Sequence, residues 1–401
     1  MKYSTLRVLS NYLFSPKISK LNLIKSLFFV LTAVGLSTVL YGCNSGKYFP
    51  LRDQNQKKFS TTDNSRLLNN IGGSRGIELR QAEFIGYHLA NQAKNGSTVH
   101  ALNQFWTKVK DRTNGKLNMT VLYKDANLPG SDGEGFLNTS SGRFDAITVN
   151  SPAISNVIPQ ILNIMTLMFA FDDSDEGLAL VHNKTFQDLL VESGKKFNVT
   201  FLPNAMLNAG TRVVTSNSDH PFSDINNIQG FKLRIPPSKS ISKQLKALGV
   251  DPIITPIGQI IQTLKSNNAY GQENPPSYIK IFKINTVQNI IWKTNHLWSA
   301  FVTAINTDTW NSWPAEWQEI VQEEAILMQK SQWKNIKLAN QNALSNASQL
   351  LGMEVRGTNF DNISDVKEFD DAREKIVASL EPKLQPIAEK IIRGRLPYSD
   401  Q

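Results

Sequence analysis

The chain has 401 residues and a formal net charge of +9, from 43 Lys and Arg against 34 Asp and Glu. Residues 1–42 supply five of the basic residues and no acid, so the rest of the chain carries 38 basic and 34 acidic residues, or +4, without a Lys/Arg block. This balance argues against nucleic acid as a partner, and the single cysteine, Cys43, excludes an internal disulfide, so stability must come from a hydrophobic core.

The first segment, residues 1–42, has the composition of an export signal. Its basic residues precede an uncharged, largely apolar run of 17 residues at 26–42, which is the order of regions in a signal peptide. Leu40-Tyr41-Gly42-Cys43 is similar to the lipobox of bacterial lipoproteins, in which cleavage leaves the cysteine lipidated. The alternative is one transmembrane helix, because 17 residues is the short end of a span. Either interpretation places the working part of the protein outside the cytoplasm.

The next segment, residues 43–76, is rich in Asn, Ser, Lys and Gln and has almost no apolar periodicity. This composition predicts a flexible tether that holds the folded part away from the membrane. Ile77 and Leu79 alternate with charged neighbours as in a strand. The pattern is lost over residues 82–96, where we expect a long loop.

Helical and strand patterns alternate from residue 97 onward. Ser97 or Thr98 can cap a helix whose apolar residues recur at helical spacing, and Asn114-Gly115 ends it. Alternating apolar residues then predict a strand at 117–123.

The same alternation continues through the middle of the chain. After a Gly-broken stretch at 127–142, the elements expected there are a strand at 145–150, a helix capped by Ser174 or Asp175, strands at 198–202, 212–215 and 232–235, and helices at 239–248 and 258–266. Alternating strands and helices of this length predict a layered α/β fold, and the chain is long enough for two domains.

The pattern changes at Trp313. Pro314 suits the first turn of a helix, and helix-compatible sequence runs from there to about Leu351, before Gly352. A helix of that length exceeds about 50 Å, at about 1.5 Å per residue. Since this is longer than one domain is wide, we expect the helix to lie across two domains. Residues 364–392 are predicted to be helical again.

Three short motifs follow one another along the middle of the chain. They are Gly210-Thr211-Arg212 with Thr215-Ser216-Asn217, Asp224-Ile225 with Gln229-Gly230-Phe231-Lys232-Leu233-Arg234-Ile235-Pro236, and Gly271-Gln272-Glu273-Asn274-Pro275. In this order and at these spacings, from about residue 79 to 359, the chain resembles the solute-binding proteins of TRAP (tripartite ATP-independent periplasmic) transporters, the DctP family.

The resemblance implies a two-lobed, periplasmic-binding-protein-like α/β fold that closes on a small organic acid. Lobe I is then expected at 77–208 plus 299–340, and lobe II at 209–298 plus 341–401. It also implies that the acid is handed to a TRAP-type membrane permease driven by an ion gradient. No cofactor is implied. Two alternatives to this function are open. One is a receptor of the same fold that signals to a sensor protein, and the other is an exported hydrolase.

The two motif arginines are the strongest candidates for the ligand site. Arg234 stands at a strand end just before Pro236, where a fixed guanidinium can hold a carboxylate through two parallel hydrogen bonds. By motif, Arg212 matches the second pocket arginine of the family. Two arginines facing one cleft repel each other unless an anion lies between them, so an anionic ligand is expected.

Four further residues are carried over from the resemblance, each with a structural alternative. Asn274 matches the Asn that reaches the ligand from the second lobe, although a turn residue would also suit this Pro-flanked position. Asp132, Asn150 and Trp298 align with positions that often line the cleft. Their alternatives are, in the same order, a cap in a Gly-rich loop, a turn residue at a strand end and a core aromatic.

The chain also departs from the family pattern near the expected ligand. Ile257-Gly258-Gln259 stands where an aromatic and an acidic residue are frequent, Tyr270 replaces a common acid, and the loop at 83–96 is longer. The pocket is therefore expected to differ in shape, and the resemblance does not name its acid.

The patterns typical of enzymes are weak. The five histidines lack metal-binding spacing, and no Gly-x-Ser-x-Gly elbow is present. The Gly-rich stretch at 130–135 lacks the Gly-Lys-Ser/Thr of a phosphate loop and is expected to be an ordinary loop. We therefore expect neither catalysis nor a metal.

Overall fold

The computed structural model describes residues 82–90, 92–123, 131–360 and 363–393. The chain divides into two units, residues 1–69 and 70–401, and every described residue belongs to the second. The predicted signal peptide, Cys43, the tether and the strand at 77–79 lie outside the described residues.

The strands of the described residues form one mixed sheet, in which the main path runs β2-β1-β3-β9-β5-β8-β6-β7, and β4 and β10 also pair with β9. Their bounds are β1 Phe84–Ala90, β2 Leu117–Tyr123, β3 Ala146–Asn150, β4 Val199–Phe201, β5 Leu207–Ser216, β6 Lys232–Ile235, β7 Asp251–Ile254, β8 Gly271–Asn274, β9 Ile290–Asn306 and β10 Glu354–Arg356.

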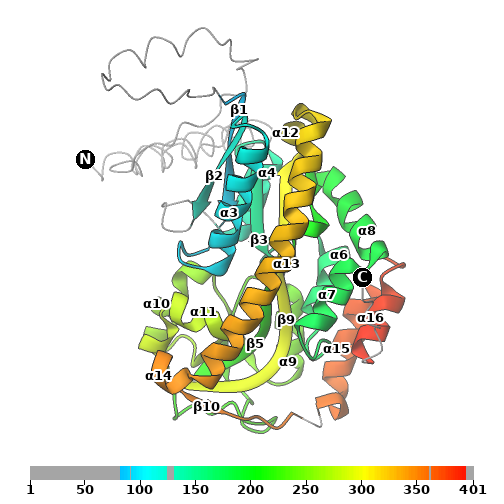
Figure 1. The fold of residues 1–401 in the computed structure, drawn as a ribbon. Helices are drawn as coiled ribbons and strands as arrows, with labels where there is room; N and C mark the ends of the chain where they lie inside the picture. The colour runs from blue at the N-terminus through cyan, green and yellow to red at the C-terminus, as the bar shows by residue number, and fades with distance from the viewer. Residues whose placement is uncertain (1–81, 91, 124–130, 361–362, 394–401) are drawn as a thin grey trace, which may run out of the picture. The chain divides into compact units, whose positions relative to one another are not determined.

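Helices cover this sheet, so the predicted α/β class is confirmed (Figure 1). They are α3 Ser97–Arg112, α4 Asp132–Ser140, α5 Ser151–Ile154, α6 Pro159–Leu162, α7 Ser174–His182, α8 Lys184–Gly194, α9 Lys239–Ala247, α10 Ile260–Lys265, α11 Pro276–Ile281, α12 Thr307–Ser312, α13 Ala315–Ser345, α14 Ala347–Leu351, α15 Lys367–Ala378 and α16 Gln385–Ile392.

Two long antiparallel strands, β5 and β9, join two groups of parallel strands. On one side β1 pairs in parallel with β2 and β3, and on the other β6 pairs in parallel with β7 and β8. The start of β9 pairs with the end of β5, as at Trp292 and Val214, whereas its later part pairs with β3, as at Phe301 and Asn150. The two long strands thus connect the two groups of parallel strands within one sheet.

Helix α13 runs across both groups of strands, as predicted from its length (Figure 1). It has 31 residues, or roughly 46 Å at about 1.5 Å per residue. Side chains of α13 form hydrogen bonds with the backbone at the start of β5 and of the residue before it. Gln332 donates to the Asn208 carbonyl and accepts from the Asn208 amide, both at 2.8 Å, and Trp333 donates to Met206 O at 2.9 Å. The helix ends earlier than expected, because Asn346 leaves the helical conformation before α14 begins.

Most other predicted elements are found within a few residues of their expected bounds, and β6 matches its range at both ends. The tail is helical as expected, but it consists of the separate helices α15 and α16. The N-cap residues of two helices lie one or two residues before the predicted ones. Gly96 precedes α3 without a side-chain cap, and Asp173 caps α7 by accepting from the amides of Asp175 and Glu176.

The loop expected at 82–96 is wrong, because it contains strand β1. A parallel strand that is covered on both faces lacks the alternation that identifies a half-exposed strand. The buried His88 also interrupts the apolar run, although it is satisfied by Trp106 Nε1 at 2.9 Å and by Thr148 Oγ1 at 2.9 Å. Burial lowers the pKa of His88 to about 3, so the imidazole is neutral at physiological pH.

The loop expected at 130–135 is wrong from Asp132 onward, where α4 begins. Ser131 and Glu134 form a capping box, in which each side chain accepts from the other residue's backbone amide. This motif starts a helix despite the glycines around it. The first residues of α4 are thereby held in a fixed position.

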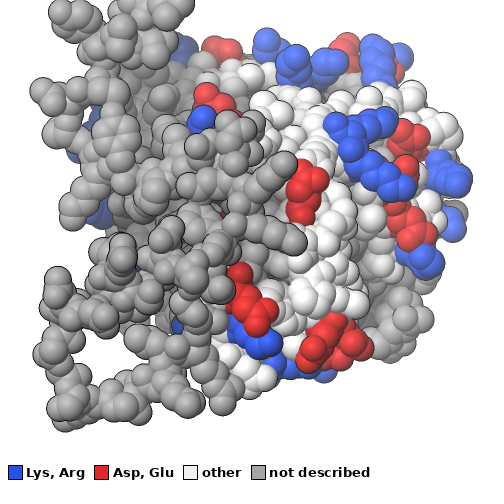
Figure 2. All heavy atoms as spheres, turned by 90° about the horizontal axis from the view of Figure 1, so that it is seen from above, with Lys and Arg blue, Asp and Glu red and all other residues white. Residues whose placement is uncertain are grey.

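The visible surface of the described residues carries both signs of charge. Figure 2 shows Lys and Arg interspersed with Asp and Glu around a broad uncharged area, without a face of one sign. No helix of the described residues combines the length and the apolar character that crossing a membrane requires.

Gly210 is the point at which β5 shifts register against β9 and approaches α13. Its φ is +99°, and a Cβ there would lie 2.1 Å from Asn340 Nδ2. Asn340 in turn binds Ala209 O and the Ser277 amide, at 3.1 and 3.0 Å. This contact therefore holds α13, β5 and α11 together.

We expect Gly210→Ala to lower the free energy of unfolding by more than the roughly 1–2 kcal/mol that a left-handed backbone costs an L-residue. Gly115→Ala is the matched control, because its φ is +80° and nothing lies within 4 Å of a Cβ there. Urea unfolding of both variants measures the difference. Equal losses would show that the approach of Asn340 contributes nothing.

Candidate functional site

A cavity of about 220 Å³ lies where several strands end between the two lobes. The carboxyl ends of β3, β6 and β8 supply Asn150, Arg234 and Asn274 to its wall, and Asp132 comes from the start of α4. In open α/β sheets, ligands bind in the crevice outside the carboxyl ends of the strands. The strand order, rather than a local loop, thus brings these polar side chains together.

Arg234 is the fixed cation of the cavity. Its side chain is almost fully buried, and Nε and Nη2 both donate to the Thr255 carbonyl, at 3.0 and 2.5 Å. The other terminal nitrogen, Nη1, donates to no described residue. Thr255 therefore holds one edge of the planar guanidinium, and the edge formed by Nη1 and the second hydrogen of Nη2 stays open.

The charge of Arg234 persists at neutral pH although the group is buried. Burial lowers its pKa to about 10, with a smaller lowering from Arg212, while the carboxylates of Glu273 and Asp132 act in the opposite direction. Among the ion pairs of the described residues, none involves Arg234. This guanidinium is desolvated without a carboxylate in contact.

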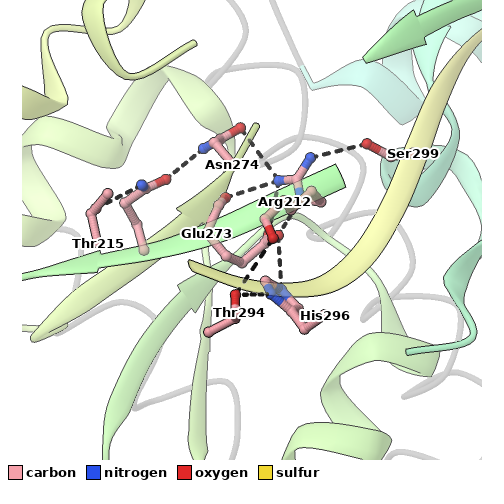
Figure 3. A network of polar contacts seen from close by, with 8 residues as sticks. Arg212, Thr215, Glu273, Asn274, Thr294, His296 and Ser299 are labelled. Carbon is pink, nitrogen blue, oxygen red and sulfur yellow. Dashed lines mark hydrogen bonds and ion pairs between the residues drawn. The ribbon is translucent and has the colours of Figure 1, made fainter. Parts of the chain in front are cut away.

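Arg212, by contrast, is already paired. Figure 3 shows its guanidinium against the carboxylate of Glu273, with Nε on Oε2 and Nη2 on Oε1 at 2.9 Å. Nη2 also donates to the Glu273 carbonyl at 2.9 Å, and Nη1 donates to Ser299 at 3.3 Å. Both arginines line the cavity as expected, but Glu273 neutralises Arg212 without a ligand, so repulsion between the two arginines does not by itself require an anion.

A histidine lies behind this ion pair. His296 Nε2 is 3.6 Å from Glu273 Oε2 and makes no hydrogen bond, while Nδ1 is 2.7 Å from Thr294 Oγ1 (Figure 3). Burial would raise the pKa of Glu273, but the adjacent guanidinium of Arg212, with a smaller contribution from the nearby His296, holds it below its ordinary value. The carboxylate is thus ionised in the protein interior.

Asn274 lines the cavity with its amide fixed on both sides. Its Oδ1 accepts from Arg212 Nη2 at 3.3 Å, and its Nδ2 donates to Gln272 Oε1 at 2.6 Å. Gln272 continues to Thr215 Oγ1 at 2.8 Å (Figure 3). The orientation of this amide is set by the protein.

Asp132 and Asn150 are half-buried and also line the cavity. Asp132 follows the Ser131 cap, and Asn150 precedes α5 without capping it through its side chain. The structure does not bring Trp298 to the cavity wall. It is fully buried between Phe171 and Trp333, with ring centroids 5.2 and 5.9 Å away, which is the core position considered as its alternative.

Sequence reasoning missed the apolar wall of the site. Tyr278, Phe282 and Phe301 line the cavity together with Ile257. In the sequence they are indistinguishable from core residues, since the three aromatic side chains are also almost fully buried. The only local signal was the position of Tyr278 soon after Asn274-Pro275. Within the described part of the chain, no group of three His, Cys, Asp or Glu is placed to hold a metal.

Comparison with known proteins gives one family. Residues 89–379 match the bacterial extracellular solute-binding proteins, family 7. The sialic acid-binding periplasmic protein SiaP of Vibrio cholerae is 26% identical over 273 residues, which are 68% of this chain and 81% of that protein. The C4-dicarboxylate-binding periplasmic protein DctP of Rhodobacter capsulatus is 25% identical over 177 residues, 43% of this chain and about half (52%) of the relative.

Solved structures show the same fold. A TRAP periplasmic solute-binding protein of Haemophilus influenzae with bound L-gulonate aligns with a TM-score of 0.67 at 21% identity, over 79% of this chain and 99% of that one. One from Desulfovibrio salexigens with bound orotic acid aligns with a TM-score of 0.69 at 19% identity, over 78% and 98%. The predicted two-lobed fold is confirmed. With the family match covering most of the chain, the protein belongs to the bacterial extracellular solute-binding proteins of family 7, which are receptors and not enzymes.

Proposed function

We propose that this protein is an extracytoplasmic receptor that holds a small organic acid by its carboxylate at Arg234 and delivers it to a TRAP-type permease driven by an ion gradient. The observation that carries the proposal is the open edge of a buried, charged guanidinium in a cavity between two lobes. Nothing else in the described part of the chain provides a desolvated cation without a carboxylate in contact.

Physical chemistry supports a carboxylate at this position. A carboxylate and the open edge of Arg234 form two parallel, charge-assisted hydrogen bonds, which neutral donors cannot match. The Thr255 carbonyl fixes the plane of the guanidinium before the ligand arrives. This preorganisation lowers the entropy that binding must overcome.

Asn274, Asp132, Asn150 and Arg212 are the further candidate contacts, because all line the same cavity. We assign Arg212 an indirect role, in which its pair with Glu273 holds Asn274 in place. Trp298 is given no ligand contact, since it lies in the core.

The relatives support both the ligand class and the partner. Structures similar to this chain have bound L-gulonate, D-glucuronate or orotic acid, each of which has a carboxylate, and they are described as TRAP periplasmic proteins. The relatives DctP and SiaP are described as periplasmic. We carry periplasmic location over to this chain, with Cys43 as the lipid anchor to a membrane.

We expect Arg234→Ala and Arg234→Lys both to lose affinity, the first by about 30- to several-thousand-fold, which corresponds to the roughly 2–5 kcal/mol cost of truncating a buried charge pair. Lysine keeps the charge but lacks the planar fork. The ligand is the acid that most raises the melting temperature in a screen of mono- and dicarboxylates, sugar acids and aromatic acids. Titration calorimetry measures the affinities.

The matched control is Arg356→Ala, an exposed arginine on β10 that pairs with Glu354 at 2.7 Å outside the cavity. Exposed pairs contribute at most about 1 kcal/mol, and this one cannot touch the ligand. Unchanged affinity in both Arg234 variants, with folding intact by circular dichroism, would refute the carboxylate anchor.

We also expect the lobes to close on the ligand, as hinged receptors do. Leu137 on α4 and Ile254 on β7 are exposed positions on opposite lobes. Spin labels at Leu137→Cys and Ile254→Cys, in a Cys43→Ser background, should move closer when the ligand is added. Pulsed electron paramagnetic resonance measures the distance. Leu137→Cys with Val191→Cys, both on one lobe, is the control pair and should keep its distance.

Cys43 is expected to carry the lipid, since the uncharged run ends at the only cysteine of the chain. Mass spectrometry of the N-terminal peptide should detect an acylated Cys43 in the membrane fraction. Cys43→Ser should give an unacylated, uncleaved or mislocalised form. A wild-type protein that is recovered soluble and without an acyl mass would contradict this proposal.

A further inference from the structure

We propose, resting on the receptor function above, that the cavity selects acids with a single carboxylate on a compact apolar or aromatic body. It would discriminate against dicarboxylates and against polyhydroxylated sugar acids. Three independent features of the cavity wall lead to this substrate class.

The first feature is the charge balance. The charged side chains that line the cavity are Asp132, Arg212 and Arg234. Since Glu273 neutralises Arg212, only the charge of Arg234 is left for a ligand. A first carboxylate satisfies Arg234, and among the described residues of the wall a second would meet no further unpaired cation but would face the carboxylate of Asp132. Burying an unpaired charge in this way is costly.

The second feature is that several polar side chains of the wall are already occupied. Asn156 donates to Pro237 O at 3.2 Å and accepts from the Lys239 amide at 2.9 Å. Asn274 likewise uses both ends of its amide within the protein. Since each amide already uses one N–H and its oxygen within the protein, a sugar acid would bury more hydroxyl groups than the remaining donors of these two amides can satisfy, and each unsatisfied group weakens binding.

The third feature is the apolar wall. The rings of Tyr278 and Phe282 are 5.8 Å apart, and those of Tyr278 and Phe301 are 6.2 Å apart. The hydroxyl of Tyr278 lies 3.3 Å from Thr98 Oγ1, so it is occupied away from the ligand. Ile257 adds an aliphatic side chain to the same wall. The part of the ligand beyond its carboxylate therefore contacts mainly carbon atoms of the cavity wall.

Three acids with six carbons test this class directly. Hexanoate has one carboxylate and an apolar chain, adipate adds a second carboxylate, and gluconate adds hydroxyl groups. We expect hexanoate, or benzoate as its aromatic counterpart, to bind the full chain at least about tenfold tighter than adipate and gluconate. Titration calorimetry measures the affinities of hexanoate, benzoate, adipate and gluconate, and each titration is repeated with Arg234→Ala.

The outcomes separate this inference from the proposed function. Tighter binding of adipate or gluconate that is lost in Arg234→Ala would overturn the inference and leave the receptor function standing. If none of the four acids binds, the inference is overturned, while the receptor function is decided by the wider screen of acids. If binding does not depend on Arg234, the carboxylate anchor fails and the inference fails with it.

Two variants test the individual features. Asp132→Asn should narrow the ratio of hexanoate to adipate affinity, because it removes the repelling charge. Ile257→Asn should narrow the ratio of hexanoate to gluconate affinity, because it gives the wall a polar group. Ile254→Asn is the matched control, since this isoleucine is half-exposed and does not line the cavity. Ratios that stay constant in both cavity variants would overturn the assigned cause of selectivity.

Discussion

The buried ion pair between Arg212 and Glu273 is the interaction on which the centre of the molecule depends. It joins β5 to β8, and through Ser299 it also reaches β9. Two charges in a protein interior are stable only when their geometry and remaining hydrogen bonds repay the loss of water, and removal of one partner typically costs about 3–5 kcal/mol. Here the guanidinium, the carboxylate and the neighbouring amide of Asn274 satisfy one another.

Because of this ion pair, the two arginines that line the cavity have different roles. The charge of Arg212 is neutralised by the carboxylate of Glu273. Arg234 is held by the neutral carbonyl of Thr255, so its positive charge is not neutralised by that contact. A cavity with two guanidinium groups in its wall therefore presents only one of them to an anion. Counting arginines in the sequence overstates the positive charge that a ligand meets.

Much of the fold and part of the site could be predicted from the sequence, for reasons that differ between residues. Arg234 and Asn274 stand at strand ends next to prolines, so a local pattern places them at the edge of the sheet. The pairing of Arg212 with Glu273 joins residues 61 positions apart, and no local pattern encodes it. Strand β1 was missed because its last three residues are buried in succession and so show no alternation, and α4 was missed because the glycines obscured its capping box.

The long strand β9 has a consequence for how the chain folds. Its 17 residues pair with β5 in one lobe and with β3 in the other, so neither lobe is a continuous stretch of sequence. Strand β3, at residues 146–150, cannot complete its antiparallel pairing until residues 301–305 of β9 have been synthesised and brought beside it. Pairings between such distant segments slow folding, because a large loop must close first. The two groups of strands on either side of β5 and β9 therefore acquire their structure together.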